Sequence, residues 1–288
     1  MRVSNCIFNH NNRRASVVFT PEKIIDCGID YLTTTTTEPE TARLLLTQAD
    51  TLISQERRRG FFVKGWAMSG YSGFACGRVQ CGERPDGAIV RLSSDMADSH
   101  WWSLFQTTGR ASRIDIQLTC RMSESPTQNI LRLSADAHRY YCGRRDGPKL
   151  TLWTDNNDGA TFYIGTRSSD WFFRAYNKES ESALEEYERC VRLELEVKHR
   201  ASVPLINWLC AGDRVHERIK ERIGGYMAQH GVLHNLADCS PGFACESQSR
   251  ATDCLKSLQW LRTQVKPTVQ KLLECNMENA VRDALGLS

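Results

Sequence analysis

Residues 171–178 read WFFRAYNK, and as a β-strand this stretch has two unlike faces. Because successive side chains of a strand point to opposite sides, one face carries Arg174, Tyr176 and Lys178. The other face carries mostly aromatic and small residues, as a face turned to a core does. Positive charge near a phenol favours its ionised form, so we expect the two cations to lower the pKa of Tyr176. The stretch therefore predicts a strand whose polar side carries a tyrosine with a lowered pKa.

Two other stretches alternate in the same way. Residues 112–119 (SRIDIQLT) and 190–198 (CVRLELEVK) each place aliphatic side chains on one side of a strand. Their other sides carry charged groups, which are Arg113, Asp115, Arg192, Glu194, Glu196 and Lys198. This pattern is typical of an antiparallel sheet with one solvated face. Taken singly, each strand needs no more than cross-strand ion pairs, worth roughly 0.2–1 kcal/mol each.

Taken together, the three polar faces predict a reactive site. If the strands are neighbours, Asp115, Glu194 and Glu196 converge, and carboxylate oxygens are what Mg²⁺ or Mn²⁺ prefers. A free phenol, with a pKa near about 10, is a poor nucleophile at neutral pH. Nearby cations and a metal that polarises a phosphate would make Tyr176 competent to attack it. The product would be a covalent phosphotyrosine ester.

The rest of the chain predicts an α+β fold, with a central antiparallel sheet and helices packed on one face. Strands are expected over 22–37, 111–120, 149–154, 160–167, 171–178 and 190–198, with hairpins in 61–92. Helices are expected over 40–58, 99–109 and 127–142, with a short acidic helix at 180–188. Ser99 is the expected cap of the second helix, and Gly109 its stop.

After residue 200 the pattern predicts only helices. Two are expected over 202–212 and 213–231, followed by a loop at 236–250 and a further helical region from 251. We therefore expect a polar lead-in over 1–20, a domain over 21–200 that carries the strands and the reactive site, and a C-terminal helical region over 201–288.

Composition bounds the class of protein without identifying it. The chain has 288 residues, 41% of them hydrophobic, and a formal charge of +3. That mild positive charge is compatible with binding to nucleic acid, and it is equally compatible with a protein that binds none. No apolar run approaches the roughly 18 residues that span a membrane, and the first residues lack a signal-peptide core, so a cytoplasmic protein is expected. The 12 cysteines contain no CxxC spacing, which favours free thiols over a zinc site.

Five segments, in order, resemble one known family. They are IDYLTTT (29–35), SRIDIQLT (112–119), FYIGTRSSDWFFRAYNKESE (162–181), CVRLELEVK (190–198) and LQWLRTQVKPTVQKLLE (258–274). The family is that of the trans-acting replication initiators of rolling-circle plasmids and filamentous phages. The resemblance implies a fold related to the HUH endonucleases, although the His-x-His pair typical of those enzymes is absent.

The resemblance also implies a function. It is an endonuclease that nicks one strand of an origin, keeps the 5′ end on a tyrosine, frees a 3′ hydroxyl for priming and later rejoins the strand. By match to the family's motifs, Tyr176 is the nucleophile, and Asp115 and Glu194 bind Mg²⁺ or Mn²⁺. Glu196 is a third ligand on strand geometry. The expected phosphate and DNA contacts are Arg174, Lys178, Arg167, Arg113, Arg192 and Lys198. Expected partners are origin DNA, a host helicase and a second copy of the chain, with no membrane.

Two alternatives stay open on the sequence. A mobilisation relaxase would use the same chemistry at a transfer origin. A catalytically inactive, origin-binding protein would keep the fold without the reaction. Exposed aromatic pairs suit a single-stranded substrate, and the candidates for base stacking are Trp101, Trp102, Tyr140 and Tyr141. Further phosphate contacts are expected from Arg144, Arg145, the arginines at 57–59 and the helix over 213–231.

Overall fold

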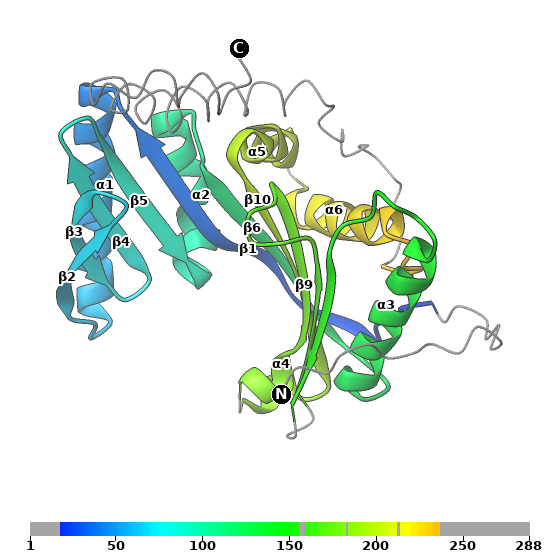
Figure 1. Ribbon diagram of the computed structural model, residues 1–288. Helices are drawn as coiled ribbons and strands as arrows, with labels where there is room; N and C mark the ends of the chain where they lie inside the picture. Colours follow the sequence, from blue (N-terminus) through cyan, green and yellow to red (C-terminus); the bar gives the residue numbers. More distant parts are fainter. Residues whose placement is uncertain (1–17, 156–158, 183, 212–213, 237–288) are drawn as a thin grey trace, which may run out of the picture. The chain divides into compact units, whose positions relative to one another are not determined.

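A ten-stranded antiparallel sheet organises the part of the chain that the computed structural model describes, which is residues 18–155, 159–182, 184–211 and 214–236 (Figure 1). The strand order is β2-β3-β4-β5-β1-β6-β10-β9-β8-β7. The strands are β1 (Lys23–Thr36), β2 (Val63–Met68), β3 (Tyr71–Cys76), β4 (Val79–Arg84), β5 (Gly87–Ser93), β6 (Arg113–Arg121), β7 (Leu150–Thr154), β8 (Ala160–Ile164), β9 (Trp171–Asn177) and β10 (Cys190–Lys198).

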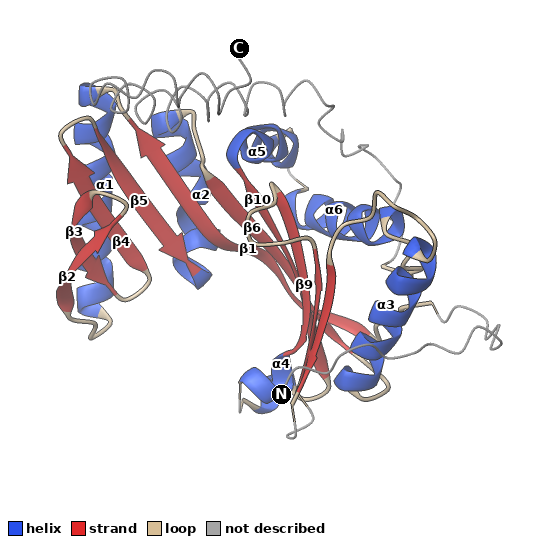
Figure 2. Cartoon of the chain, viewed as in Figure 1, coloured by secondary structure: helices blue, strands red, loops and turns tan. Residues whose placement is uncertain are grey.

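The longer helices cover one face of this sheet (Figure 2). They are α1 (Pro39–Arg58), α2 (Ser94–Thr108), α3 (Pro126–Tyr141), α5 (Ser202–Cys210) and α6 (Val215–Gln229). Helix α1 packs on β3–β5, α2 on β1 and β5, and α3 on β7–β10. Helix α5 packs on β10, and α6 packs on β1, β6 and β10. The short α4 (Lys178–Glu181) follows β9. The predicted antiparallel α+β fold is confirmed.

The alternation of the central strands explains which face the helices cover. On β6 and β10 the aliphatic residues Ile114, Ile116, Leu193 and Leu195 are fully buried in one hydrophobic core. Burying such side chains stabilises the fold by about 1.5–3 kcal/mol each. Since successive side chains point to opposite sides, the charged residues between them must lie on the face without helices.

Two predicted helix boundaries are wrong. Helix α2 begins at Ser94 rather than at residue 99, because Met96 and Ala97 are buried and extend its apolar stripe by a turn. Its predicted stop is confirmed, since Gly109 has φ 59, a left-handed conformation that glycine adopts without strain. The predicted acidic helix at 180–188 is instead α4 followed by a 3₁₀ turn, Glu185–Tyr187, because the Asn177 side chain caps a helix that starts earlier.

Strand β1 is irregular at two places, and both bring aspartates to the polar face. Its register with β6 shifts between Ile24 and Asp26 and again between Ile29 and Tyr31. Asp98 of α2 fixes the second shift, because its Oδ1 accepts a 2.8 Å hydrogen bond from the Ile29 amide. Gly28 leaves the room for this, since a Cβ there would lie 2.4 Å from the same oxygen. The sequence pattern of a regular strand, with its strict alternation of faces, does not reveal these bulges.

The remaining expectations have mixed outcomes. The described cysteines are free thiols, as predicted. In the described part of the chain, no helix is long and apolar enough to cross a membrane. The described residues all belong to one compact unit. The three-part division of the chain stays a prediction, and the elements expected beyond residue 236 lie outside the described residues.

Candidate active site

Tyr176 lies on β9, on the face of the sheet that the helices leave uncovered. Its hydroxyl donates a 2.6 Å hydrogen bond to Oε1 of Glu194 on the neighbouring strand. The register explains this contact, because Arg192 lies opposite Tyr176 and Glu194 lies opposite Arg174. The three polar strand faces predicted from sequence are therefore neighbours, in the order β6, β10, β9.

The pKa of Tyr176 is raised above its ordinary value, so the expected lowering is wrong. Burial is the largest cause, and the charge and hydrogen bond of Glu194 add to it. The two cations expected to lower it have other partners, since Arg174 pairs with Glu194 and Lys178 pairs with Glu181. At neutral pH the phenol keeps its proton, and that proton points at the Glu194 carboxylate.

Glu194 is one of three buried carboxylates at this site, although the polar face was expected to be solvated. Asp115, Glu194 and Glu196 are 1%, 3% and 1% exposed. Arg113 covers two of them, with its Nη2 2.5 Å from Asp115 Oδ2 and 2.8 Å from Glu196 Oε2. Burial raises the pKa of Asp115 to about 6 despite Arg113, and it also raises the pKa of Glu194. Arginines pair with each carboxylate of this cluster.

The carboxylates suit a divalent metal in type but not in placement. Oxygen donors are what Mg²⁺ and Mn²⁺ take, and Asp115, Glu194 and Glu196 carry such oxygens. However, no three His, Cys, Asp or Glu side chains in the described ranges lie close enough to hold an ion. The Arg174 guanidinium pairs with Glu194 and lies 3.9 Å from Asp115, where a shared cation would sit. A metal would therefore fit here only after these arginines have moved away from the carboxylates.

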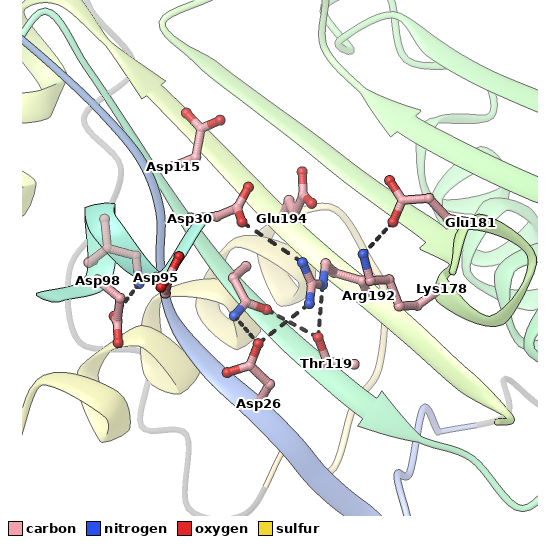
Figure 3. Close-up of polar contacts among 12 residues, drawn as sticks. Asp26, Asp30, Asp95, Asp98, Asp115, Thr119, Lys178, Glu181, Arg192 and Glu194 are labelled. Carbon is pink, nitrogen blue, oxygen red and sulfur yellow. Dashed lines mark hydrogen bonds and ion pairs between the residues drawn. The ribbon is translucent and has the colours of Figure 1, made fainter. Parts of the chain in front are cut away.

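Arg192 is the centre of a second polar group, which sequence reasoning missed (Figure 3). Its Nε donates to Thr119 Oγ1 at 2.9 Å and its Nη2 to Asp26 Oδ2 at 3.4 Å, while Nη1 lies 3.9 Å from Asp30 Oδ1. These partners leave Arg192 only 7% exposed. The signal for Asp26 and Asp30 was present, since both lie in a strand that is otherwise rich in β-branched residues.

A cavity of 620 Å³ opens beside the Tyr176 hydroxyl. Its lining comes from Asp30 of β1, Arg192 and Glu194 of β10, Arg174 of β9, and residues of β7, β8 and α4. Trp153 of β7 lies at this cavity and is 60% exposed. Its register partner Thr161 lies opposite Tyr176, so a small side chain separates the two rings. The cavity offers a tyrosine hydroxyl, cations and an exposed ring to a substrate.

Comparison with known families identifies the group to which this site belongs. A family model described as "Replication initiation factor" matches residues 109–285, which include Asp115, Tyr176 and Glu194. The chain belongs to the replication initiation factor family. The resemblance seen in the sequence is thereby confirmed.

Other comparisons add little about this replication initiation factor. No curated protein matches it. Among solved structures it is similar to the rolling circle replication initiator protein from Geobacillus stearothermophilus, with 12% sequence identity and a TM-score of 0.44. That match covers 70% of this chain and 84% of the other. The likeness is too distant to carry conclusions about the site.

The remaining candidate residues of this initiation factor lie farther from Tyr176. Lys198 and Arg113 face each other toward the opposite end of β10 and β6. Arg167 is exposed in the β8–β9 turn, and its carbonyl accepts a hydrogen bond from Lys198. The structure brings Arg174, Arg192 and Lys178 to the tyrosine's cavity and leaves Arg167 outside it.

The four aromatic candidates for base stacking all lie on helices α2 and α3. Trp101 of α2 is 8% exposed and packs in the hydrophobic core. Tyr141 hydrogen-bonds His230 at 2.6 Å, and Arg144 lies 3.9 Å from the ring centroid of Tyr140. Trp102 is 40% exposed, but it lies on a helix that packs on the face opposite Tyr176.

Proposed function

We propose that this protein nicks one strand of a replication origin by tyrosine transesterification and later rejoins it. The observation that carries the proposal is the hydrogen bond from the Tyr176 hydroxyl to Glu194 at the edge of a cavity lined by cations. A nucleophile paired with a base within hydrogen-bond reach is the arrangement that covalent catalysis requires. Membership of the replication initiation factor family supplies the biological context.

The geometry suggests how the reaction proceeds. The Tyr176 oxygen forms a bond to the phosphorus of the scissile phosphodiester, and the bond from phosphorus to the 3′ oxygen breaks. Because the pKa of Tyr176 is raised, the phenol is neutral before attack and its proton passes to Glu194 as the new bond forms. The departing 3′ oxygen takes up a proton and becomes a free hydroxyl. In the closing reaction a 3′ hydroxyl attacks the phosphotyrosine and regenerates the phenol.

The cations at the cavity have a role in the same scheme. A phosphodiester carries negative charge throughout the displacement, and fixed positive groups stabilise the charge that develops in the transition state. Arg174, Lys178 and Arg192 all line the cavity. Arg174 is paired with Glu194, so an incoming phosphate would compete with that carboxylate for the guanidinium. This exchange would leave Glu194 better able to accept the tyrosine proton.

We also propose Mg²⁺ or Mn²⁺ as cofactor, on the chemistry of the carboxylates alone. Asp115 and Glu194 would hold it, with Glu196 as a third ligand, only after the arginines between them have moved. A bound ion would raise the melting temperature, since a ligand at 100 times its dissociation constant stabilises by about 2.7 kcal/mol. We expect that rise in the wild type and not in Asp115→Asn. An equal rise in both proteins would contradict this ligand assignment.

The proposed reaction is tested with purified protein, a supercoiled plasmid carrying the cognate origin, and Mn²⁺ or Mg²⁺. The wild type should relax the plasmid and form a covalent protein–DNA adduct, and Tyr176→Phe should do neither. Tyr163→Phe, a tyrosine on the same face that lies opposite Arg174, is the control and should still form the adduct. Biological activity that survives in Tyr176→Phe would instead favour an inactive, origin-binding protein. The expected partners, which are origin DNA, a host helicase and a second copy of the chain, remain part of the proposal.

A further inference from the structure

The face that carries Tyr176 continues beyond the site, across the whole β1–β5 part of the sheet. Helices α1 and α2 pack on the other side of these strands. The pairing registers put one residue from each strand in a single row across the uncovered face, in the order Lys64, Ala75, Gln80, Arg91, Thr33, Arg113 and Lys198. We call its four positive members, Lys64, Arg91, Arg113 and Lys198, the cationic row.

The cationic row begins at the catalytic carboxylates and extends away from them. Lys198 pairs with Glu196, and Arg113 pairs with Asp115 and Glu196. Arg91 and Lys64 have no carboxylate within ion-pair distance in the described residues. The row crosses six strand spacings of about 4.8 Å, or roughly 29 Å. Its far half therefore carries positive charge without an internal counter-charge.

Aromatic rings support the arginines of this face. The Arg91 guanidinium carbon lies 5.7 Å from the ring centroid of Trp66. Arg113 lies 4.3 Å from the ring of Tyr31 in the same way. A guanidinium held over a ring keeps its N–H donors while losing freedom of movement. The arginines are thus fixed as flat, charged groups along the sheet.

Trp66 itself lies over glycines. Its register partner on β3 is Gly73, and the next residue across, on β4, is Gly82. A Cβ on Gly82 would lie 3.0 Å from Cζ3 of Trp66, so the ring rests on backbone there. With no side chains at those two positions, a half-buried indole lies beside Arg91. A flat ring next to a guanidinium is a platform on which a nucleic-acid base stacks.

We propose that the cationic row and Trp66 bind the single-stranded DNA that flanks the nicked phosphate. This inference rests on the proposed function, because the row starts at the proposed catalytic carboxylates. Phosphates would contact Arg91 and Lys64, and a base would stack on Trp66. A single strand is favoured over a duplex because adjacent strands of a sheet rotate by roughly 20–25°, and a flexible chain follows such a surface. Duplex DNA, with a persistence length of about 150 bp, does not.

Binding of a fluorescent 16-nucleotide oligothymidine, measured by anisotropy over a salt series, tests this surface. Arg91→Ala should bind more weakly and reduce the slope of log K against log salt by about 0.7, the value for one lost phosphate contact on a single strand. Trp66→Ala should weaken binding roughly tenfold or more through the lost stack, and Trp66→Phe should recover part of it. The matched control is Arg43→Ala, an exposed arginine of α1 behind the sheet, which should change neither.

The outcomes are separable from those of the nicking assay. Unchanged affinity and salt slope in both Arg91→Ala and Lys64→Ala, with wild-type circular dichroism, would overturn the surface. So would tighter binding of a 16-bp duplex than of the single strand, or no binding of oligothymidine by the wild type. If the wild type binds through these residues but forms no tyrosine adduct, the surface stands and the proposed reaction fails.

Discussion

The Tyr176 hydroxyl donates a hydrogen bond to the Glu194 carboxylate, and burial disfavours a charge on either group. Burial raises the pKa of the carboxyl and that of the phenol. The raised pKa disfavours a preformed phenolate at neutral pH, so in the proposed reaction nucleophilic attack by Tyr176 would be coupled to removal of its proton. Glu194 Oε1, 2.6 Å from the hydroxyl, is the acceptor in place for that proton. In the proposed reaction Glu194 would therefore act as the base, in addition to the role as metal ligand expected from sequence.

Replacing Glu194 by glutamine tests that role. Glu194→Gln keeps the shape of the side chain and removes its ability to take the proton. We expect the single-turnover rate of adduct formation to fall about 10²–10⁴-fold, the usual contribution of a general base. Glu181→Gln, at the same cavity but paired with Lys178, is the control and should react at a near-normal rate. A fall of less than threefold in Glu194→Gln would show that another group removes the proton.

His230 provides a test of burial away from the site. Burial lowers the pKa of His230 to about 4, while its Nδ1 lies 2.6 Å from the Tyr141 hydroxyl. The unfolded value is about 6.5, so between pH 6.5 and 4 the unfolded chain binds more protons than the folded one. The free energy of unfolding should therefore decrease by about 1–3 kcal/mol as the pH falls through that window. Urea unfolding at pH 7 and pH 4.5 should show a smaller decrease for His230→Gln, and an identical decrease would contradict the assignment.

At the scale of elements, a buried carboxylate joins helix α1 to the sheet. Glu56 is fully buried; its Oε2 accepts a 2.8 Å hydrogen bond from the Arg78 amide, and its Oε1 pairs with Arg59 at 3.0 Å. Gly77, with φ +52, permits this approach, because a Cβ there would lie 2.0 Å from the carboxylate. The contact fixes the end of α1 against the β3–β4 turn.

Removing Glu56 should loosen that junction. Glu56→Ala removes a fully buried carboxylate and leaves the Arg78 amide without its acceptor, and we expect a loss of about 1–3 kcal/mol in the free energy of unfolding. Glu40→Ala, an exposed residue of the same helix, should change it by less than about 0.5 kcal/mol. Equal effects of the two substitutions in urea unfolding would mean that the buried contact contributes nothing.

Elements with strict alternation were predictable from sequence, and irregular ones were not. Strands β6, β9 and β10 show the period of two, and that pattern placed Asp115, Tyr176 and Glu194 on one face. Asp26 and Asp30 escaped prediction because the bulges in β1 shift the period. The pKa of Tyr176 escaped it as well, because sequence shows which charges are near but not how they pair or how deeply the group is buried.

At the scale of the whole described unit, the sheet is what assembles the site from distant parts of the chain. Residues near positions 30, 115, 176 and 194 meet because β1, β6, β10 and β9 lie side by side in the sheet. The same continuity links the site to Trp66 and Arg91 on the far strands. Family membership was predictable from ordered motifs, whereas the arginines that occupy the carboxylate cluster required coordinates. The site and the proposed DNA surface are thus two parts of one sheet face.

The most direct test of the central claim is to locate the covalent bond. The protein is incubated with its origin DNA, the adduct is digested with nuclease and protease, and the peptides are sequenced by mass spectrometry. The account predicts a nucleotide attached through its 5′ phosphate to the peptide that contains Tyr176, at that residue. A nucleotide on any other residue, or none on a preparation that nicks the origin, would contradict it.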